Sequence, residues 1–378
     1  MDLGFSEEQE MLRKTARDFL ETECPTSLVK EMAEDEQGYT SELWGKMAEL
    51  GWMGLALPEE HDGMGMSFLD LAVLLEEMGR ACLPGPFFST VVLGGLTILE
   101  AGNEEQKKEF LPKIAAGEAI LTMALTEPSA SYDPASITVK AVPDKDDYVI
   151  SGTKLFVENA HIADYLICVT RTKDGAGKGE DGITLFLVDG KSPGITTTLL
   201  KTIAGDKQCE ITFDNVRVPQ KNMLGERDKG WPVVAKILQK ATVAKCAEMI
   251  GGAQAALDMS VAYAKERIQF GRPIGSFQAI QHHCANMVTD VDGSRFITYQ
   301  AAWKVSEGLP AVMEVSMAKA WVSEAYRRVT QLGHQIHGGI GFCMDHDMPL
   351  YFKRAKAAEP TFGSADWHRE IVARELGL

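Results

Sequence analysis

The sequence predicts an α+β protein with an N-terminal helical domain over residues 1–120, a middle β-barrel domain over 121–228 and a C-terminal helical domain over 229–378. Two observations lead to this division. In the first and last parts, apolar residues recur every three or four positions, which is the period of a helix. In the middle part, short runs rich in β-branched residues are separated by Gly, Asp and Asn, which is typical of strands and turns.

Helix start and stop signals divide the N-terminal part. Ser6, followed by three acidic or amide residues, predicts an N-cap and a helix with apolar residues at helical spacing. Ser41 predicts a second helix that ends at Gly51, and residues 104–114 form a further amphipathic stretch. The segment Leu83-Pro-Gly-Pro-Phe between them is a turn-rich break.

Strand-like segments fill the middle part: YVISGTKLFV, DYLICVTR, GITLFLVD and CEITFDNVRVP. No helical periods lie between them, so we expect an antiparallel barrel or sandwich rather than βαβ units. After Gly230 the pattern returns to helices, the first spanning roughly 231–267.

Composition excludes several classes of function. The net charge of −16 argues against nucleic-acid binding, because little positive charge is available to neutralise phosphates. The seven cysteines include no CxxC pair, which indicates reduced thiols and no metal site. No apolar run reaches 18 residues and the first residues are acidic, so we expect no membrane span and a cytoplasmic protein.

Three motifs in the C-terminal part carry a family resemblance: ERIQFGRPIGSFQAIQH (266–282), HQIHGGIGF (334–342) and the tail 351–378. With the order helix, strand, helix, they resemble the acyl-CoA dehydrogenase superfamily over essentially the whole chain. The resemblance implies that fold, an FAD cofactor and an acyl-CoA thioester substrate. It also implies electron-transfer flavoprotein as a partner, and either a homotetramer or a heteromer with a related subunit.

The glycines of the second motif let a ligand approach the backbone closely, although a helix-end turn is the alternative interpretation. An arginine suits a pyrophosphate because its guanidinium donates two parallel hydrogen bonds. The resemblance assigns the adenosine and pyrophosphate end of FAD to the following residues: Arg267, Phe270, Gln278, Gln335, Gly338, Gly339, Ser364 and Asp366.

Two segments of the middle part resemble the loops that meet the flavin ring in this family. Thr126-Glu-Pro-Ser-Ala-Ser-Tyr-Asp resembles Thr-Glu-Pro-Gly-Ala-Gly-Ser-Asp, although a simple β-turn is the alternative. Phe156-Val-Glu-Asn-Ala resembles Trp-Ile-Thr-Asn-Gly. The resemblance implies flavin contacts by Leu125, Thr126, Ser131, Phe156 and Glu158, and a substrate contact by Tyr132, which replaces a serine. The alternative for Glu158 is a side chain turned to solvent or to an arginine, because a carboxylate beside the flavin would disfavour its anionic reduced form.

The catalytic base of the family is missing from its usual place. Relatives carry a glutamate in a Glu-Gly-Thr turn, and the matching residues here are Phe362, Gly363 and Ser364. Some relatives carry the base on the long helix instead, at the position that matches Ala241. The resemblance gives the backbone N–H of Phe362 the role of donor to the thioester carbonyl, because a backbone group survives a side-chain change.

One face of the long helix carries candidates for the missing catalytic base and for a substrate-binding group. Ala241, Lys245 and Glu248 fall at i, i+4 and i+7, which is one helical face. If this face lines the acyl pocket, Lys245 is a candidate for holding a distal carboxylate and Glu248 for a displaced base. The alternative is a plain surface ion pair.

The sequence therefore leaves three hypotheses open. The chain is an acyl-CoA dehydrogenase with a relocated base that acts on a bulky, cyclic or dicarboxylic thioester, or it is the base-less partner subunit of a heteromeric dehydrogenase. In the third hypothesis, the flavin serves to eliminate another group from an acyl-CoA.

Overall fold

The computed structural model describes residues 4–173 and 179–378. The described chain forms two compact units. The helical unit comprises the described residues of Met1–Glu31, together with Ser67–Leu83 and Thr242–Leu378. The sheet unit comprises Met32–Met66 and the described residues of Pro84–Ala241. The predicted domain boundaries at 120 and 228 remain predictions, since this division follows contacts rather than chain order.

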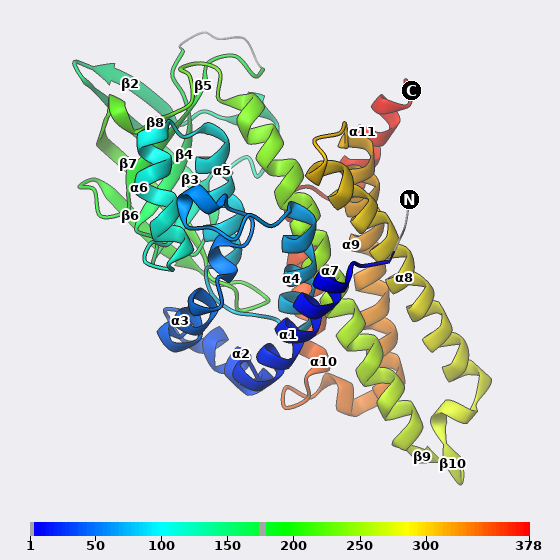
Figure 1. The fold of residues 1–378 in the computed structure, drawn as a ribbon. Helices are drawn as coiled ribbons and strands as arrows, with labels where there is room; N and C mark the ends of the chain where they lie inside the picture. The colour runs from blue at the N-terminus through cyan, green and yellow to red at the C-terminus, as the bar shows by residue number, and fades with distance from the viewer. Residues whose placement is uncertain (1–3, 174–178) are drawn as a thin grey trace. The chain divides into compact units, whose positions relative to one another are not determined.

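Long helices build the helical unit, and α8 and α9 pack along one another (Figure 1). Helices α10 and α11 pack against α9, while α1 and α8 pack against α4. The bounds are α1 (Glu7–Glu23), α4 (Phe68–Arg80), α7 (Trp231–Glu266, in this unit from Thr242 on), α8 (Gln278–Ser306), α9 (Val312–His337), α10 (Met348–Ala358) and α11 (Ala365–Glu375). Two short strands, β9 (Ile268–Gln269) and β10 (Arg272–Pro273), form a hairpin between α7 and α8.

Local sequence explains where these helices begin. The Ser6 hydroxyl accepts from the Gln9 N–H, and the Gln9 side chain accepts from the Ser6 N–H, so α1 starts with a capping box as predicted. The helix α3 (Ser41–Glu49) starts one residue earlier than predicted. Its N-cap is Thr40 rather than Ser41, because the Thr40 hydroxyl accepts from the Leu43 N–H.

The sheet unit is built on an eight-stranded sheet with the order β6-β7-β3-β2-β4-β5-β8, and β1 pairs with β4. The strands are β1 (Leu121–Ala124), β2 (Lys140–Asp144), β3 (Asp147–Glu158), β4 (Tyr165–Arg171), β5 (Ile183–Asp189), β6 (Ile195–Leu200), β7 (Gln208–Pro219) and β8 (Met223–Leu224). Figure 1 shows this sheet in green and teal. Only short 3-10 turns interrupt the described strands, so the prediction of β-structure without helical crossovers is confirmed.

The expectation of purely antiparallel pairing is wrong at two strand pairs, because β1 and β2 both run parallel to β4. Strand β1 runs parallel to β4 over four residue pairs, from Leu121 opposite Tyr165 to Ala124 opposite Cys168. The connection between these two strands passes through the β2–β3 hairpin and therefore returns β4 in the same direction as β1. The α+β fold class is confirmed.

Helices also belong to the sheet unit. They are α3, α5 (Leu96–Ala101), α6 (Glu104–Ala115) and a π-helix over Phe88–Gly95, while α2 (Thr26–Glu34) runs from the helical unit into this one. The α6 bounds match the amphipathic stretch predicted at 104–114. The π-helix packs on β1 and follows the predicted break at residues 83–87.

Helices α4 and α7 cross at glycines within the helical unit. A Cβ on Gly251 would lie 1.8 Å from the Glu76 carbonyl oxygen, and a Cβ on Gly79 would lie 2.0 Å from the Glu248 carbonyl oxygen. Both distances are far below contact distance, so only glycine allows this separation of the two backbones.

Gly251→Ala is therefore expected to destabilise the protein by about 1–3 kcal/mol, because the new methyl group forces α4 and α7 apart. Gly45→Ala is the matched control, since no heavy atom lies within 4 Å of a Cβ placed there in α3. The control is expected to stabilise by about 0.5–1 kcal/mol. Urea denaturation measures both. Equal effects of the two substitutions would contradict a tight crossing.

Candidate cofactor and thioester site

A buried ion pair anchors the segment that follows β1 in the sheet unit. The Lys154 ammonium, with no exposed surface, lies 2.8 Å from the Glu127 carboxylate and donates to the Leu125 carbonyl at 3.0 Å. Glu127 also accepts from the Thr138 and Val139 N–H groups at 2.8 and 3.0 Å. These partners come from β3 and from the two residues just before β2, so they fix the start of the segment.

Electrostatics favour the ionised pair. Burial works to raise the pKa of the Glu127 carboxyl, but the Lys154 ammonium and the surrounding hydrogen bonds outweigh it and hold that pKa below its usual range. A buried pair of this kind resists the loss of either partner, because the remaining charge would be left without compensation.

A bulge near the end of β3 presents Phe156. The pairing with β7 shifts between Lys154 and Val157, and Phe156 adopts the left-handed conformation with φ 56°. Its side chain is 49% exposed. The preceding Leu155 N–H donates to the Thr126 carbonyl at 2.8 Å, so the two predicted ring-contacting segments lie side by side. A bulge commonly re-aims a side chain in this way.

The other predicted ring contacts occupy different settings. Leu125 and Thr126 are buried, and Glu158 is half-buried opposite Gln208 of β7. The Ser131 hydroxyl accepts from the Asp133 N–H at 3.1 Å and so stabilises its own turn. Tyr132 is half-buried in the same turn. Their roles toward flavin or substrate remain predictions.

In the helical unit, ring stacking brings two predicted cofactor segments together. Tyr263, one turn before Arg267, stacks on His337 at 4.6 Å between ring centroids, and His337 directly precedes Gly338. This ring contact therefore brings together the residues just before the hairpin at Arg267 and the residues just before the glycine turn at the end of α9.

The exposed groups around this point suit a cofactor with a pyrophosphate and a planar base. Within the part of the chain that the structure describes, no acidic side chain pairs with the Arg267 guanidinium. No heavy atom lies within 4 Å of a Cβ placed on Gly338 or Gly339. Phe270 is 91% exposed at the hairpin tip. An unpaired cation, open backbone and an exposed aromatic ring fit the adenosine diphosphate part of FAD.

Phe362 lies in a tightly fixed turn between α10 and α11. It is buried and adopts a left-handed conformation with φ 59°. The His368 imidazole donates to the Phe362 carbonyl at 3.0 Å, and the buried Lys319 ammonium donates to the Gly363 carbonyl at 3.1 Å. The position that the resemblance gives to the base is thus structured, and it carries a phenyl ring.

The residues that follow this turn have local partners. Ser364 is the N-cap of α11 and accepts from the Trp367 N–H at 3.3 Å. The exposed Asp366 accepts from Arg369 at 2.9 Å. Gln278 and Gln335 are exposed on α8 and α9. Contacts of these four residues with FAD remain predictions.

On α7, the Lys245 ammonium lies 2.7 Å from the Glu248 carboxylate. Their side chains are 15% and 24% exposed, so the pair is largely shielded from water. The two side chains therefore form an ion pair, as the alternative interpretation expects, although the pair is mostly shielded rather than at the surface. Ala241 is fully buried on the same helix and carries no carboxylate. One turn after Glu248, the space beside Gly252 is filled by the Tyr326 hydroxyl, 2.2 Å from where a Cβ would lie.

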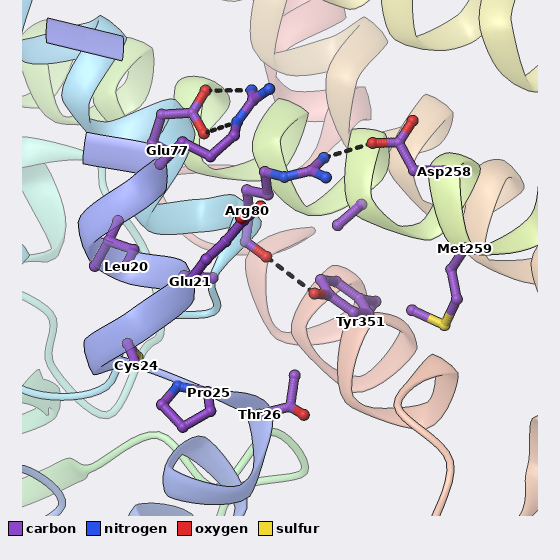
Figure 2. A pocket seen from close by; sticks show the side chains of 13 residues that line it. Leu20, Glu21, Cys24, Pro25, Thr26, Glu77, Arg80, Asp258, Met259 and Tyr351 are labelled. Carbon is purple, nitrogen blue, oxygen red and sulfur yellow. Dashed lines mark hydrogen bonds and ion pairs between the residues drawn. The ribbon is translucent and has the colours of Figure 1, made fainter. Parts of the chain in front are cut away.

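A separate cavity of about 350 Å³ lies among α1, α4, α7 and α10 (Figure 2). Arg17 donates twice to Glu77, at 2.9 and 2.7 Å, and Arg80 donates to Asp258 at 2.6 Å. Both arginines that line the cavity are therefore paired with carboxylates that line it too. None of the predicted site residues lines this cavity.

Comparison with protein families gives three consecutive matches. The N-terminal, middle and C-terminal domains of acyl-CoA dehydrogenase match residues 6–118, 122–216 and 228–377. The chain belongs to the acyl-CoA dehydrogenase family. It is therefore an oxidoreductase of a family whose members depend on FAD and act on the CH–CH bond of acyl-CoA thioesters.

Individual relatives cover the full chain. Probable acyl-CoA dehydrogenase YngJ of Bacillus subtilis is 35% identical over 100% of both chains. The caffeyl-CoA reductase-Etf complex subunit CarC of Acetobacterium woodii is 34% identical over 98% of this chain and 99% of its own length.

Solved structures agree with the fold. Butyryl-CoA dehydrogenase of Megasphaera elsdenii superposes with a TM-score of 0.93 at 29% identity over 100% of both chains. A structure described as the Tcur3481-Tcur3483 steroid ACAD G363A variant gives 0.87 at 32% identity, covering 100% of this chain and 99% of its own. None of the helices that the structure describes combines the length and apolarity that a membrane span requires.

Sequence reasoning missed the groups that hold these segments in place, namely Glu127, Lys154, Lys319 and His368. Glu127 stands inside the quoted loop motif and Lys154 inside a predicted strand, but nothing in a sequence distinguishes a buried lysine from the usual exposed one. His368 lies in α11, where a lone histidine gives no sequence signal of the hydrogen bond that it donates to the Phe362 carbonyl.

Stability is expected to fall as the pH drops from about 6.5 to about 4. Burial lowers the pKa of the His368 imidazole to about 4, so in this window the unfolded chain binds more protons than the folded one. His368→Asn, which can still donate to the Phe362 carbonyl, should flatten the dependence by up to about 1.4 kcal/mol per pH unit. Urea midpoints at several pH values measure the slope. An unchanged slope, equal to that of the exposed control His282→Asn, would contradict this.

Proposed function

We propose that this protein oxidises or reduces a CoA thioester at its Cα–Cβ bond with a base other than residue 362. The observation that carries the proposal is Phe362, which stands where the family resemblance places a glutamate. A phenyl ring cannot accept a proton, whereas the turn around it is intact. Bound FAD would supply the hydride acceptor or donor, and the Phe362 backbone N–H would polarise the thioester carbonyl.

Glu248 is the proposed base. It is a carboxylate on the α7 stripe that the resemblance assigns to the acyl pocket, and it is shielded from water. The Lys245 ammonium lies 2.7 Å from this carboxylate and holds it in place on the helix. The competing interpretation is that the two residues form only a structural ion pair.

The proposed substrate is a bulky, cyclic or dicarboxylic acyl group. Lys245 supports the dicarboxylic case, because an ammonium on the pocket stripe suits a distal carboxylate. Similarity to a protein described as a steroid ACAD supports a bulky ring system. Leu125, Thr126, Ser131, Phe156 and Glu158 would meet the flavin ring, and Tyr132 and Ala241 the substrate.

The second candidate function is a base-less partner subunit of a heteromeric dehydrogenase. Two observations favour it: Phe362 lacks a proton acceptor, and structures of paired family members such as the ChsE4-ChsE5 complex match this chain with a TM-score of 0.90 at 28% identity. In this case the chain would contribute its hairpin and glycine turn to a shared FAD site. Electron-transfer flavoprotein is the proposed redox partner in either case, as the name of the CarC relative suggests, and the cytoplasm is the proposed location.

Arg267→Ala is expected to weaken FAD binding about ten- to a hundredfold, because a charged hydrogen bond contributes about 1.5–3 kcal/mol. Flavin absorbance retained after dialysis and a fluorescence titration measure the loss. Arg374→Ala is the control, as that arginine pairs with Glu370 near the end of α11. Full flavin retention in Arg267→Ala would remove this residue from the proposed site.

Glu248→Gln separates the two roles of the α7 pair. If Glu248 is the base, the variant should lose about 10²-fold or more of turnover with flavin and CoA-ester binding intact. Lys245→Gln removes the cation but leaves the carboxylate in place, so it should lose much less turnover than Glu248→Gln. If both variants change only thermal stability, the residues form a structural pair.

Phe362→Glu tests the partner-subunit alternative. The purified wild-type protein is first mixed with acyl-CoA substrates, and loss of its flavin colour is followed by absorbance. A wild-type protein that bleaches alone has a base of its own. A wild-type protein that does not bleach, together with a Phe362→Glu variant that does, supports the partner subunit.

A further inference from the structure

Lys319 is an unusual buried cation in the helical unit. Its side chain has no exposed surface. Among the residues that the structure describes, no carboxylate lies within ion-pair distance of its ammonium. It donates instead to the Ser323 hydroxyl at 2.9 Å and to the main-chain carbonyls of Ala358, Glu359 and Gly363 at 3.2, 2.9 and 3.1 Å. A lysine is expensive to bury, so these oxygens must compensate for the loss of water.

The three carbonyls belong to one turn. Ala358 is the last residue of α10 and Glu359 its C-cap, so their carbonyls lack partners within the helix. The C-terminal end of a helix carries partial negative charge, which a cation stabilises. Gly363 lies on the far side of the turn with φ 107°. The Lys319 ammonium therefore donates hydrogen bonds to both ends of the turn that contains Phe362.

We infer that Lys319 is a positioning residue for the thioester site: it fixes the turn 358–363 and, through it, the left-handed conformation of Phe362. This inference rests on the proposed function only in assigning thioester binding to Phe362. The fixing of the turn stands on the four donor–acceptor distances alone.

The number of hydrogen bonds that Lys319 can donate depends on whether its amine is protonated. Burial lowers the pKa of its ammonium to about 8, so the group is protonated below that pH and becomes a neutral amine with one donor fewer above it. The facing groups are Cys246 and Lys245 on α7, Glu359 at the end of α10 and His368 on α11. Glu359 is already engaged by Arg327 at 2.7 Å and Lys356 at 3.5 Å.

Hydrogen exchange tests the structural half of the inference. Lys319→Met keeps the length of the side chain but removes every donor, so amides of residues 359–365 should exchange about tenfold faster or more. Ser323→Ala is the matched control, because it removes one acceptor and leaves the three carbonyl contacts. Unchanged exchange in Lys319→Met would overturn the inference. Should that variant fail to fold, wild-type exchange at pH 7 and pH 9, corrected for intrinsic rates, gives the same comparison.

A ligand pair tests the functional half. Butyryl-CoA carries a thioester carbonyl, and its thioether analogue S-butyl-CoA does not. The wild-type protein should prefer the thioester, and Lys319→Met should lose about three- to tenfold of that preference, the size of one hydrogen bond. The wild-type preference should also decline above pH 8. An unchanged preference in Lys319→Met overturns the positioning role.

The experiments distinguish failure of the proposed thioester contact from failure of the positioning role of Lys319. Faster exchange in Lys319→Met, with no thioester preference in the wild-type protein, leaves the fixing of the turn intact and overturns the proposed thioester contact of Phe362. A wild-type preference that Lys319→Met retains, despite faster exchange, leaves the proposed function intact and overturns Lys319 as its positioning residue.

Discussion

The main constraint on both units is that an ammonium group removed from water must be surrounded by oxygen atoms. Lys154 in the sheet unit and Lys319 in the helical unit have no exposed surface. Lys154 meets this requirement with the Leu125 carbonyl and the Glu127 carboxylate, and Lys319 meets it with three main-chain carbonyls of the turn 358–363 and the Ser323 hydroxyl. Moving either segment would leave a buried charge uncompensated, which costs several kcal/mol. Irregular backbone is thereby fixed by hydrogen bonds from a buried side chain.

This arrangement explains how the turn at Phe362 keeps its shape without a glutamate. Its contacts come from main-chain atoms: the Phe362 carbonyl with His368, and the Gly363 carbonyl with Lys319. Gly363 itself cannot be replaced freely, since a Cβ there would lie 2.4 Å from the Trp367 ring. None of these contacts uses the side chain at 362. These two main-chain contacts therefore do not depend on which side chain stands at position 362.

The fold could be predicted largely from the sequence because it follows from period and turn chemistry. The Ser6 capping box and the β-branched strands of the middle part are local signals, and they gave the element types. The parallel pair of β1 and β4 could not be predicted, since pairing between distant strands leaves no local pattern. Site residues came from the family motifs. Lys154 and Lys319 were missed because burial of a lysine depends on which carbonyls the tertiary fold brings to it.

The choice between an enzyme and a partner subunit depends on how Glu248 is held. Its backbone lies at the crossing of α7 and α4, where a Cβ on Gly79 would come within 2.0 Å of the Glu248 carbonyl oxygen. One turn further along, the Tyr326 side chain of α9 fills the space beside Gly252. Glu248 is therefore carried by a helix fixed on two sides rather than by a mobile loop. A carboxylate on such a rigid element can act as a base only if the substrate is brought to it, because the helix itself cannot adjust.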